Sequence, residues 1–373
     1  MISVSRSAVV SAAVSAICLP LYAVFPTIVG LNGDLARYGS SGIQLLCGDG
    51  RRVWANYQFE PVFVAVWWAL AKVWAVLFGP GAAEYCADPR LNIFWLVITA
   101  VAVLVVLQIY IVRSLGVGAL SFHLVFCLDT ALLMMPFNLI RQFVAVIMVL
   151  ALVSLMLRDR IQPRWFVAAL AVPALVHWSA WALLLMGVIS VMVVEWPRVS
   201  RIRLKRSASS LVVVLIALVV LGVLAATAYV LSVSYLLPRI QTILSNPRRF
   251  AGFGIEPTVR GLVSPITLAV LLFAYAISRQ LGAGFARTFM ISTAAMYFAV
   301  AASGMVPAME RMRMLVLPAT YFAFLYVLDK RTTDPRWQVV NVLFVLFAVF
   351  NFSWHAMISR PFADRASFLQ LFE

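Results

Sequence analysis

The chain has 373 residues, of which 64% are hydrophobic and 12% charged, and its mean hydropathy is +0.99. One or two soluble domains of this size could not keep so much apolar surface away from water, so the composition excludes a soluble fold. It predicts an all-α, polytopic integral membrane protein in which residues 1–373 form a single transmembrane domain. No soluble basic surface is left over that could bind a nucleic acid.

Apolar runs of about 20 residues, the length that crosses a bilayer as a helix, recur along the chain. The first run, at residues 8–30, is longer than the apolar core of a signal peptide, so it predicts an uncleaved span. The short runs 165–178 and 180–196 together predict a helical hairpin that turns near His177. About eleven spans are expected in all, at residues 8–30, 91–112, 117–136, 139–157, 165–178, 180–196, 208–231, 262–279, 286–305, 314–328 and 338–358.

The segment Phe59–Phe78 is apolar enough to cross the membrane but carries Glu60 near its start and Lys72 within it. If it crossed, Arg6 would change sides relative to the rest of the chain. We therefore expect an amphipathic or re-entrant helix on the outer leaflet, where its tryptophans suit the membrane interface. A true span at this position is the alternative.

Basic residues in short loops stay in the cytoplasm, and this rule sets the orientation of the bundle. With the spans given above, 15 of the 29 basic residues fall on the side of Arg6, which places the N-terminus in the cytoplasm. The other 14 remain at the outer face, where carboxylates are few. All but three of the 29 are arginines, whose planar guanidinium groups bind phosphate and carboxylate in pairs of hydrogen bonds. The surplus therefore predicts an anionic partner at the outer face.

Two regions outside the spans are expected to be external. Residues 31–90 contain the predicted interfacial helix, and Cys47 and Cys86 within them are expected to form a disulfide in an oxidising space. Residues 232–260 form a basic loop that contains Arg248 and Arg249. This loop is either a solvated surface segment or a clamp for an anionic lipid head group or acidic glycan.

Four polar segments meet the outer side of this map: residues 32–38 with 59–61, residues 138–142, residues 177–179 and residues 310–313. Arg141 is expected about one turn into an apolar helix, which marks a functional candidate, with an interfacial snorkelling arginine as the alternative. An imidazole at His177 could accept a proton from a sugar hydroxyl near neutral pH. A structural histidine is the alternative there.

The run Phe137–Ala145, a basic turn and then His177–Ala180 resemble the core signature of EpsG-like, Wzy-type polysaccharide polymerases. Gly33–Tyr38 with Phe59–Pro61, and the late Glu310–Arg311, are similar to the flanking motifs of that family and follow in the same order. The resemblance covers most of the chain. It implies a GT-C-like glycosyltransferase of the bacterial inner membrane that faces the periplasm. Such an enzyme transfers a growing glycan from one undecaprenyl diphosphate carrier to the sugar on another.

This resemblance assigns roles to particular residues. The expected catalytic residues are His177, Arg141, Glu60 and Asp34, with His177 as the candidate base. Those expected to bind the substrate diphosphate are Arg141, Gln142, Arg311, Arg313, Arg248 and Arg249, supported by Asn138 and Glu310. Arginines fixed in a poorly hydrated site can stabilise the leaving diphosphate, and the sequence has no Asp-x-Asp pair for magnesium. We therefore expect a reaction without metal or cofactor.

Two other functions stay open on sequence grounds. A transporter or flippase of lipid-linked sugars could use the same arginine-lined cavity, although no internal repeat is recognised. A glycosyltransferase that adds a single sugar from a polyprenyl phosphate carrier, with Asp34 as base, is the other alternative. The expected partners are the lipid-linked glycan donor and acceptor and membrane lipids, and a chain-length regulator is a further candidate.

Overall fold

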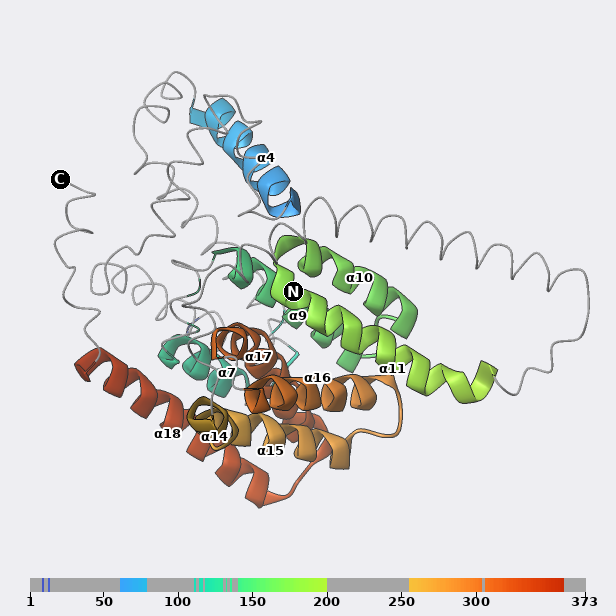
Figure 1. Cartoon of the computed structure of the whole chain (residues 1–373), viewed down its shortest axis with the longest axis vertical. Coiled ribbons are helices and arrows are strands. Elements are labelled where there is room, and N and C mark those ends of the chain that lie inside the picture. Colours follow the sequence, from blue (N-terminus) through green and yellow to red (C-terminus); the bar gives the residue numbers. More distant parts are fainter. Residues whose placement is uncertain are drawn as a thin grey trace, which may run out of the picture.

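The computed structural model describes residues 61–78, 118–129, 140–199, 255–303 and 306–358, together with residues 9, 13, 111, 114–116, 132 and 135. Every regular element in these ranges is a helix, so the all-α fold class is confirmed for them (Figure 1). The elements are α4 (Pro61–Phe78), α7 (Gly118–Leu128), α9 (Ile140–Leu157), α10 (Pro163–Val176), η2 (Trp178–Ala180), α11 (Trp181–Val199), α14 (Ile255–Leu262), α15 (Pro265–Gln280), α16 (Phe285–Ala302), α17 (Val306–Arg331) and α18 (Pro335–Ile358). Apart from residues 9, 13 and 111, the expected spans 8–30, 91–112 and 208–231 lie outside the described residues, as do the Cys47–Cys86 disulfide and the basic loop before residue 255.

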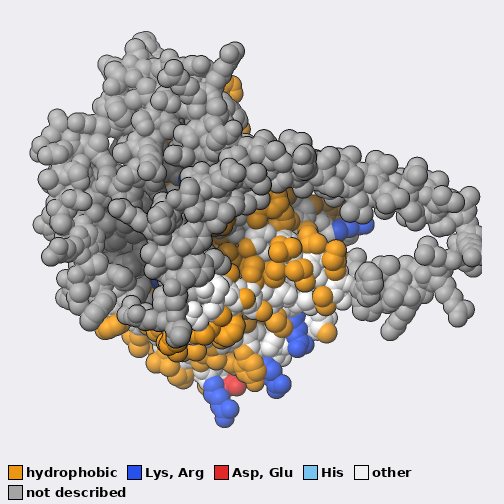
Figure 2. Space-filling model, in the orientation of Figure 1, with side chains coloured by type: hydrophobic (Ala, Val, Ile, Leu, Met, Phe, Trp, Pro, Cys, Tyr) orange, Lys and Arg blue, Asp and Glu red, His pale blue; other side chains and the backbone are white. Residues whose placement is uncertain are grey.

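The described helices have the length and composition of a helical membrane protein. Three of them are long and apolar enough to cross a bilayer: Ile140–Leu157, Phe285–Ala302 and Arg311–Arg331. Four shorter apolar helices accompany them. Large apolar side chains such as Met192, Val193 and Leu343 stay exposed on the outside of the bundle, as expected where lipid replaces water (Figure 2).

The hairpin predicted around His177 is confirmed. Helix α10 begins at Pro163, where the fixed φ of proline suits a first turn and its missing N–H is not needed. The helix ends where His177 turns into an extended conformation, with φ −150° and ψ 126°, and donates its backbone N–H to the Pro173 carbonyl at 2.9 Å. The short 3-10 helix η2 then leads directly into α11.

Two predicted spans differ in extent from the helices that the structure describes. The span expected at 314–328 belongs to α17, which begins at Val306, so Glu310–Arg313 lie inside the helix and not in a loop before it. Methionine, glutamate and arginine favour helix, and the chain continues as helix through these polar positions. The span expected at 117–136 is interrupted, because α7 ends at Leu128 and Asp129 lies outside it.

Helix α17 lies at the centre of the described bundle. It packs against α7, α9, α15 and α16, and its apolar window is more deeply buried than those of the other two candidate spans. Aromatic rings fill the space between α15, α17 and α18: the ring centroids of Phe273 and Phe324 are 4.7 Å apart, and those of Tyr321 and Phe344 are 4.8 Å apart. Such contacts hold α17 in one register against its neighbours.

Helices α9 and α17 run parallel, and this defines two ends of the bundle. Near their starts, the Gln142 side chain donates to the Arg311 carbonyl. Near their ends, Ser154 and Asp329 both contact residues 114–118. The short α9–α10, α15–α16 and α17–α18 connections meet at this second end, which we call the basic end. Its described basic residues are Arg158, Arg160, Arg164, Arg279, Arg287, Lys330, Arg331 and Arg336.

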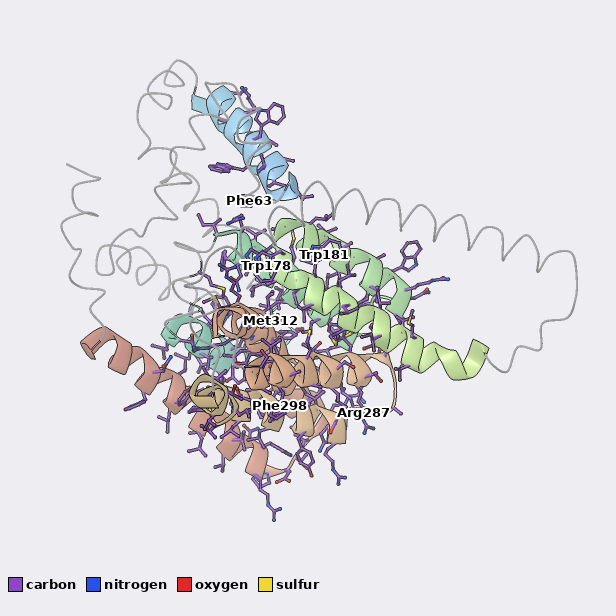
Figure 3. All side chains as sticks on the ribbon, viewed as in Figure 1. Phe63, Trp178, Trp181, Arg287, Phe298 and Met312 are labelled. Atoms are coloured by element: carbon purple, nitrogen blue, oxygen red, sulfur yellow. The ribbon has the colours of Figure 1, made fainter. Side chains whose placement is uncertain are left out.

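The opposite end, which we call the His177 end, contains the turn between α10 and α11 and the starts of α9 and α17. Figure 3 shows Trp178, Trp181 and Met312 near one another, with Arg287 apart from them. The described basic clusters thus lie together at one end of the bundle, as the span count predicts.

The segment expected as an interfacial helix is helical over Pro61–Phe78, as α4. Phe63, Val64 and Trp67 are buried, and α4 packs against α10 (Figure 1). Val66 and Trp68 are exposed on the other face. The helix at this position is confirmed, and its place at the outer leaflet stays a prediction.

Candidate functional site

Of the first predicted polar segment only Pro61 is described, whereas the other three have described residues that meet at the His177 end. Gln142 comes from the first turn of α9, His177 and Trp178 from the turn between α10 and α11, and Arg311 from the first part of α17. Arg141 is the second residue of α9. Asp34, Glu60, Asn138, Arg248 and Arg249 lie outside the described residues, and for Glu310 only the backbone, within α17, is described.

Arg311 joins these segments. Its guanidinium carbon lies 5.4 Å from the centroid of the Trp178 ring, a cation–π arrangement worth about 0.5 to 2 kcal/mol. Its backbone carbonyl accepts a hydrogen bond of 2.7 Å from Nε2 of Gln142. A permanently charged side chain is thereby held beside an aromatic ring at the same end of the bundle as Arg141 and His177.

Gln142 is 1% exposed, and its amide orientation follows from its contact. A backbone carbonyl can only accept, so the side-chain atom that faces Arg311 must be the NH₂ group. The amide oxygen Oε1 is then an acceptor, and no described residue donates a hydrogen bond to it. A buried acceptor without a donor is costly, which is typical of a site that a water or a ligand hydroxyl completes.

His177 is 6% exposed and caps η2 with its side chain. Its Nδ1 accepts the backbone N–H of Ser179 at 3.3 Å and lies 2.6 Å from the Ser179 hydroxyl oxygen. The side chain of His177 thus holds the start of η2, and η2 leads into α11.

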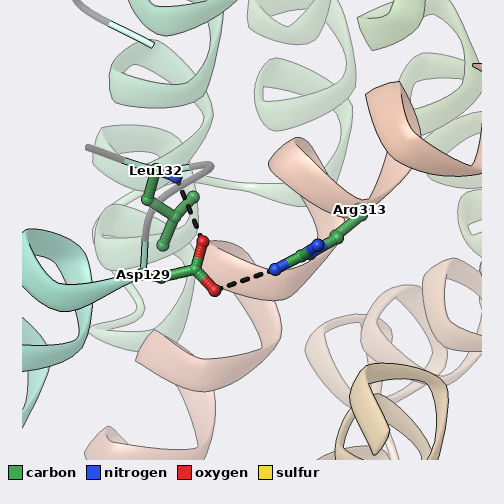
Figure 4. A network of polar contacts seen from close by, with 3 residues as sticks. All are labelled: Asp129, Leu132 and Arg313. Atoms are coloured by element: carbon green, nitrogen blue, oxygen red, sulfur yellow. Dashed lines mark hydrogen bonds and ion pairs between the residues drawn. The ribbon is translucent and has the colours of Figure 1, made fainter. Parts of the chain in front are cut away.

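Arg311 and Arg313 point to different partners. Residues that are two positions apart in a helix are rotated by about 200° around its axis, so the side chains of Arg311 and Arg313 leave opposite faces of α17. Arg313 donates from Nη2 to Oδ2 of Asp129 at 2.9 Å, while Asp129 also accepts the backbone N–H of Leu132 at 3.2 Å through Oδ1 (Figure 4). Arg313, one of the arginines assigned to the diphosphate, thus has its charge balanced by a carboxylate.

Asp129 was missed in the reading of the sequence. It is 2% exposed and pairs with an arginine 184 residues later in the chain. The signal that could have found it is its setting, since an aspartate inside a predicted span is expensive and needs a partner. Its location between α7 and Leu132, where the predicted span is interrupted, gives the carboxylate a backbone donor that an unbroken helix would not offer.

A second missed residue is His123 on α7, which is fully buried. Neither ring nitrogen has a hydrogen-bond partner among the described residues, and the ring lies edge-on to Phe122. Two residues away, Ser121 belongs to a buried chain in which Tyr321 donates to Asn341 at 2.7 Å and Asn341 donates to Ser121 at 3.0 Å. This chain links α17, α18 and α7.

The part of the chain that the structure describes holds no group of three or more histidine, cysteine or acidic side chains placed to bind a metal ion. The donors at the His177 end are guanidinium, imidazole and amide groups, which suit phosphate and hydroxyl ligands. No model of a known protein family matches the chain, and neither the characterised proteins nor the solved structures contain a match to it.

Proposed function

We propose that the protein is a membrane glycosyltransferase of the Wzy type, which polymerises oligosaccharide repeat units linked to undecaprenyl diphosphate. The proposal includes about eleven spans in a GT-C-like bundle of the bacterial inner membrane, with the His177 end facing the periplasm. The observation that carries it is the meeting of Gln142, Trp178 and Arg311, which belong to three separate segments of the polymerase-like pattern.

The depth of these residues supports a lipid-linked substrate. Trp181, one turn after His177, is 46% exposed, and Trp68 on α4 is exposed as well. Trp165, with Arg164 stacked on its ring at 5.9 Å, is exposed at the basic end. Exposed tryptophans gather at the two faces of a membrane. The arginines at the His177 end are then near one interface, the depth at which the diphosphate of a polyprenyl carrier lies.

The chemistry needs a group that stabilises the leaving diphosphate. The acceptor hydroxyl forms a bond to the anomeric carbon of the donor glycan, and the bond from that carbon to the diphosphate oxygen breaks. The electron pair leaves with the diphosphate, whose charge Arg141 and Arg311 stabilise without reorganising. The hydroxyl proton goes to a base, for which His177, Glu60 and Asp34 are the candidates. No metal or cofactor is part of the proposal.

The remaining expected residues have supporting roles in the proposal. Asn138 and Glu310 flank Arg141 and Arg311 in sequence and would orient them. Arg248 and Arg249 in the external loop would bind the lipid head group or the glycan. A chain-length regulator is a candidate partner of the outer face.

Replacement of Arg141 or Arg311 by alanine tests the function. Each change should lower the rate of glycan elongation about 100-fold, the usual effect of removing one donor from a preorganised anion site, and long chains should vanish from the glycan ladder. Arg164→Ala, at the basic end, is the matched control and should keep the normal ladder.

The assay uses purified protein in liposomes that contain lipid-linked repeat units, with product length read by gel. Normal ladders from both Arg141→Ala and Arg311→Ala would show the proposal to be wrong. Movement of the lipid-linked unit across the bilayer without longer product would indicate a transporter, and addition of one sugar would indicate a single-sugar transferase.

A further inference from the structure

We propose that an anionic phospholipid binds at the basic end with its phosphate between α15 and α18. The site is formed by Tyr275 and Arg279 at the end of α15 and by Arg336 and Trp337 at the start of α18, and we call these four residues the α15–α18 patch. The rings of Tyr275 and Trp337 join the two helices there, with their centroids 6.3 Å apart. This inference needs only that the helices lie in a membrane, so it does not depend on the proposed function.

The end of α15 presents an aromatic ring and an arginine on one face. Tyr275 and Arg279 are four positions apart, so Arg279 follows Tyr275 one turn later on the same side of the helix. Both side chains are exposed. At the start of α18, Arg336 is exposed and Trp337 is partly buried against Phe324, with the two ring centroids 6.2 Å apart. The patch thus places two cations beside rings that the bundle holds in position.

The positive charge of the patch is not balanced by a described carboxylate. The acidic side chains described at the basic end are Asp159, Asp329 and Asp334. Asp329 accepts backbone N–H groups at the start of α7, and Asp334 accepts the backbone N–H of Arg336 at 2.9 Å. Neither Arg279 nor the guanidinium group of Arg336 forms an ion pair with these or any other described acid. Both guanidinium groups can therefore bind an external anion, and their planar donors suit phosphate oxygens.

The start of α16 adds to the positive potential near Arg279. A short connection leads from the end of α15 to Gly284, which precedes α16 and provides no side-chain cap. The first turn of α16 contains no acidic residue and carries Arg287. The partial positive charge of a helix start favours a nearby anion and opposes an arginine that has none. The sequence therefore places an arginine where a phosphate group relieves an unfavourable interaction.

Apolar side chains continue from the patch along both helices, which indicates a lipid and not a soluble anion. On α15, Leu272 is exposed one turn before Tyr275, and on α18, Val339 and Leu343 are exposed one and two turns after Arg336. Figure 2 shows Lys and Arg side chains at the border of the exposed apolar surface. A phospholipid fits both features, because its phosphate contacts the arginines while its acyl chains lie along the apolar faces. Tyrosine and tryptophan are enriched at the depth of the lipid head groups.

The lipid preference of the patch is measured by competition. Full-length protein in non-ionic detergent micelles is mixed with equal amounts of phosphatidylglycerol and phosphatidylcholine that have the same acyl chains, and native mass spectrometry compares the two lipid-bound species. Each arginine at an anionic lipid surface strengthens binding about fivefold, so the two together should favour phosphatidylglycerol about 25-fold. Added salt should weaken this preference. Equal binding of the two lipids would show that the inference is wrong.

Three double variants test whether the patch itself binds the head group. Arg279→Gln with Arg336→Gln should lower the preference for phosphatidylglycerol about 25-fold. Arg279→Lys with Arg336→Lys keeps the charge and should lower the preference less than about fivefold. Arg158→Gln with Arg160→Gln is the matched control, because it removes the same charge from the α9–α10 connection, and its effect should also stay below about fivefold. If this control weakens the preference as much as the glutamine variant of the patch, the proposed site is wrong.

A stability measurement and a soluble competitor complete the test. Because Arg279 and Arg336 are exposed, their replacement by glutamine should leave the thermal unfolding of the lipid-free protein unchanged. Glycerol phosphate, which has a phosphate group but no acyl chains, should not displace phosphatidylglycerol at equal concentration, because burial of the acyl chains contributes to binding. Displacement at equal concentration would indicate a site for soluble anions and overturn the proposed lipid site.

Discussion

At the scale of single residues, the two arginines of α17 show how helix geometry divides similar side chains between different tasks. Arg311 lies over Trp178, and its carbonyl is held by Gln142. Arg313, two positions later, is paired with Asp129 on the other side of the helix. The first has a setting suited to an anionic ligand, and the second joins the end of α7 to α17.

The Asp129–Arg313 pair makes a measurable prediction. Both side chains are largely buried, at 3% and 14% exposure, so removal of one takes a charged partner away from the other in a poorly hydrated place. Asp129→Ala and Arg313→Ala should each lower the free energy of unfolding by about 3 kcal/mol, and the double variant should lose clearly less than the sum. Thermal unfolding of the protein in detergent micelles measures all three.

The control for these single and double substitutions is Arg160→Ala. Arg160 is an exposed arginine at the basic end, so its loss should change the free energy of unfolding by less than about 0.5 kcal/mol. Additive effects of the two single substitutions would show that the pair does not couple α7 to α17.

At the scale of elements, Asp329 near the end of α17 holds the start of α7. Its carboxylate accepts the backbone N–H of Gly116 at 2.7 Å and that of Gly118 at 3.2 Å. A carboxylate at a helix N-terminus satisfies amides that have no partner within the helix and interacts favourably with the helix dipole. The close approach requires that Gly118 have no side chain, because an added Cβ would lie 2.8 Å from the carboxylate oxygen.

Gly118→Ala should therefore destabilise the protein by about 1 to 3 kcal/mol, since the carboxylate must move away from both amides. Gly116→Ala is the matched control: its Cβ would lie 3.6 Å from the same oxygen, an ordinary contact, and its effect should be small. The comparison is made by thermal unfolding in micelles. A larger loss from Gly116→Ala than from Gly118→Ala would contradict the described contact.

The existence of most described elements could be predicted from sequence, because long apolar runs and prolines at the helix starts are local signals. Pro163, Pro265 and Pro335 each begin a helix within a few residues of a predicted span. The early start of α17 could not be predicted from sequence, because the charged residues at 310–313 resemble a loop unless tertiary contacts are known. The same holds for Asp129, whose interruption of a span depends on an arginine far away in sequence.

For the candidate site, the sequence predicted the segments and left their geometry open. It indicated Arg141, His177 and Arg311 by their polarity in apolar surroundings. It assigned Arg311 and Arg313 to one ligand, whereas their positions in α17 direct the two side chains to opposite faces of the helix. It also named His177 as the candidate base, and that role stays a prediction. The contact of its side chain with the backbone N–H of Ser179 is one that only the turn geometry reveals.

At the scale of the whole molecule, the two ends of the bundle differ in charge and in contacts, which makes orientation testable. Ala283, exposed in the α15–α16 connection at the basic end, is replaced by cysteine in a variant without native cysteines. A membrane-impermeant maleimide added to spheroplasts should leave this cysteine unlabelled until the membrane is permeabilised, because basic loops stay in the cytoplasm.

Ser303→Cys, in the α16–α17 connection at the His177 end, is the matched position and should be labelled without permeabilisation. Labelling of Ala283→Cys in intact spheroplasts, with protection of Ser303→Cys, would show that the orientation is the reverse of the predicted one. Arg141 and Arg311 would then face the cytoplasm.

The hydrogen bond between Gln142 and Arg311 spans 169 residues of sequence, and this separation has a consequence for the order of assembly. At usual translation rates of 5 to 20 residues per second, Gln142 and His177 emerge roughly 10 to 30 s before Arg311 can join them. During that time the hairpin of α10 and α11 is already made, while the helix that fills the centre of the bundle is still missing. A nascent chain that stops before α17 would therefore lack both the central helix of the bundle and Arg311. The candidate site can form only after the C-terminal third of the protein has been made.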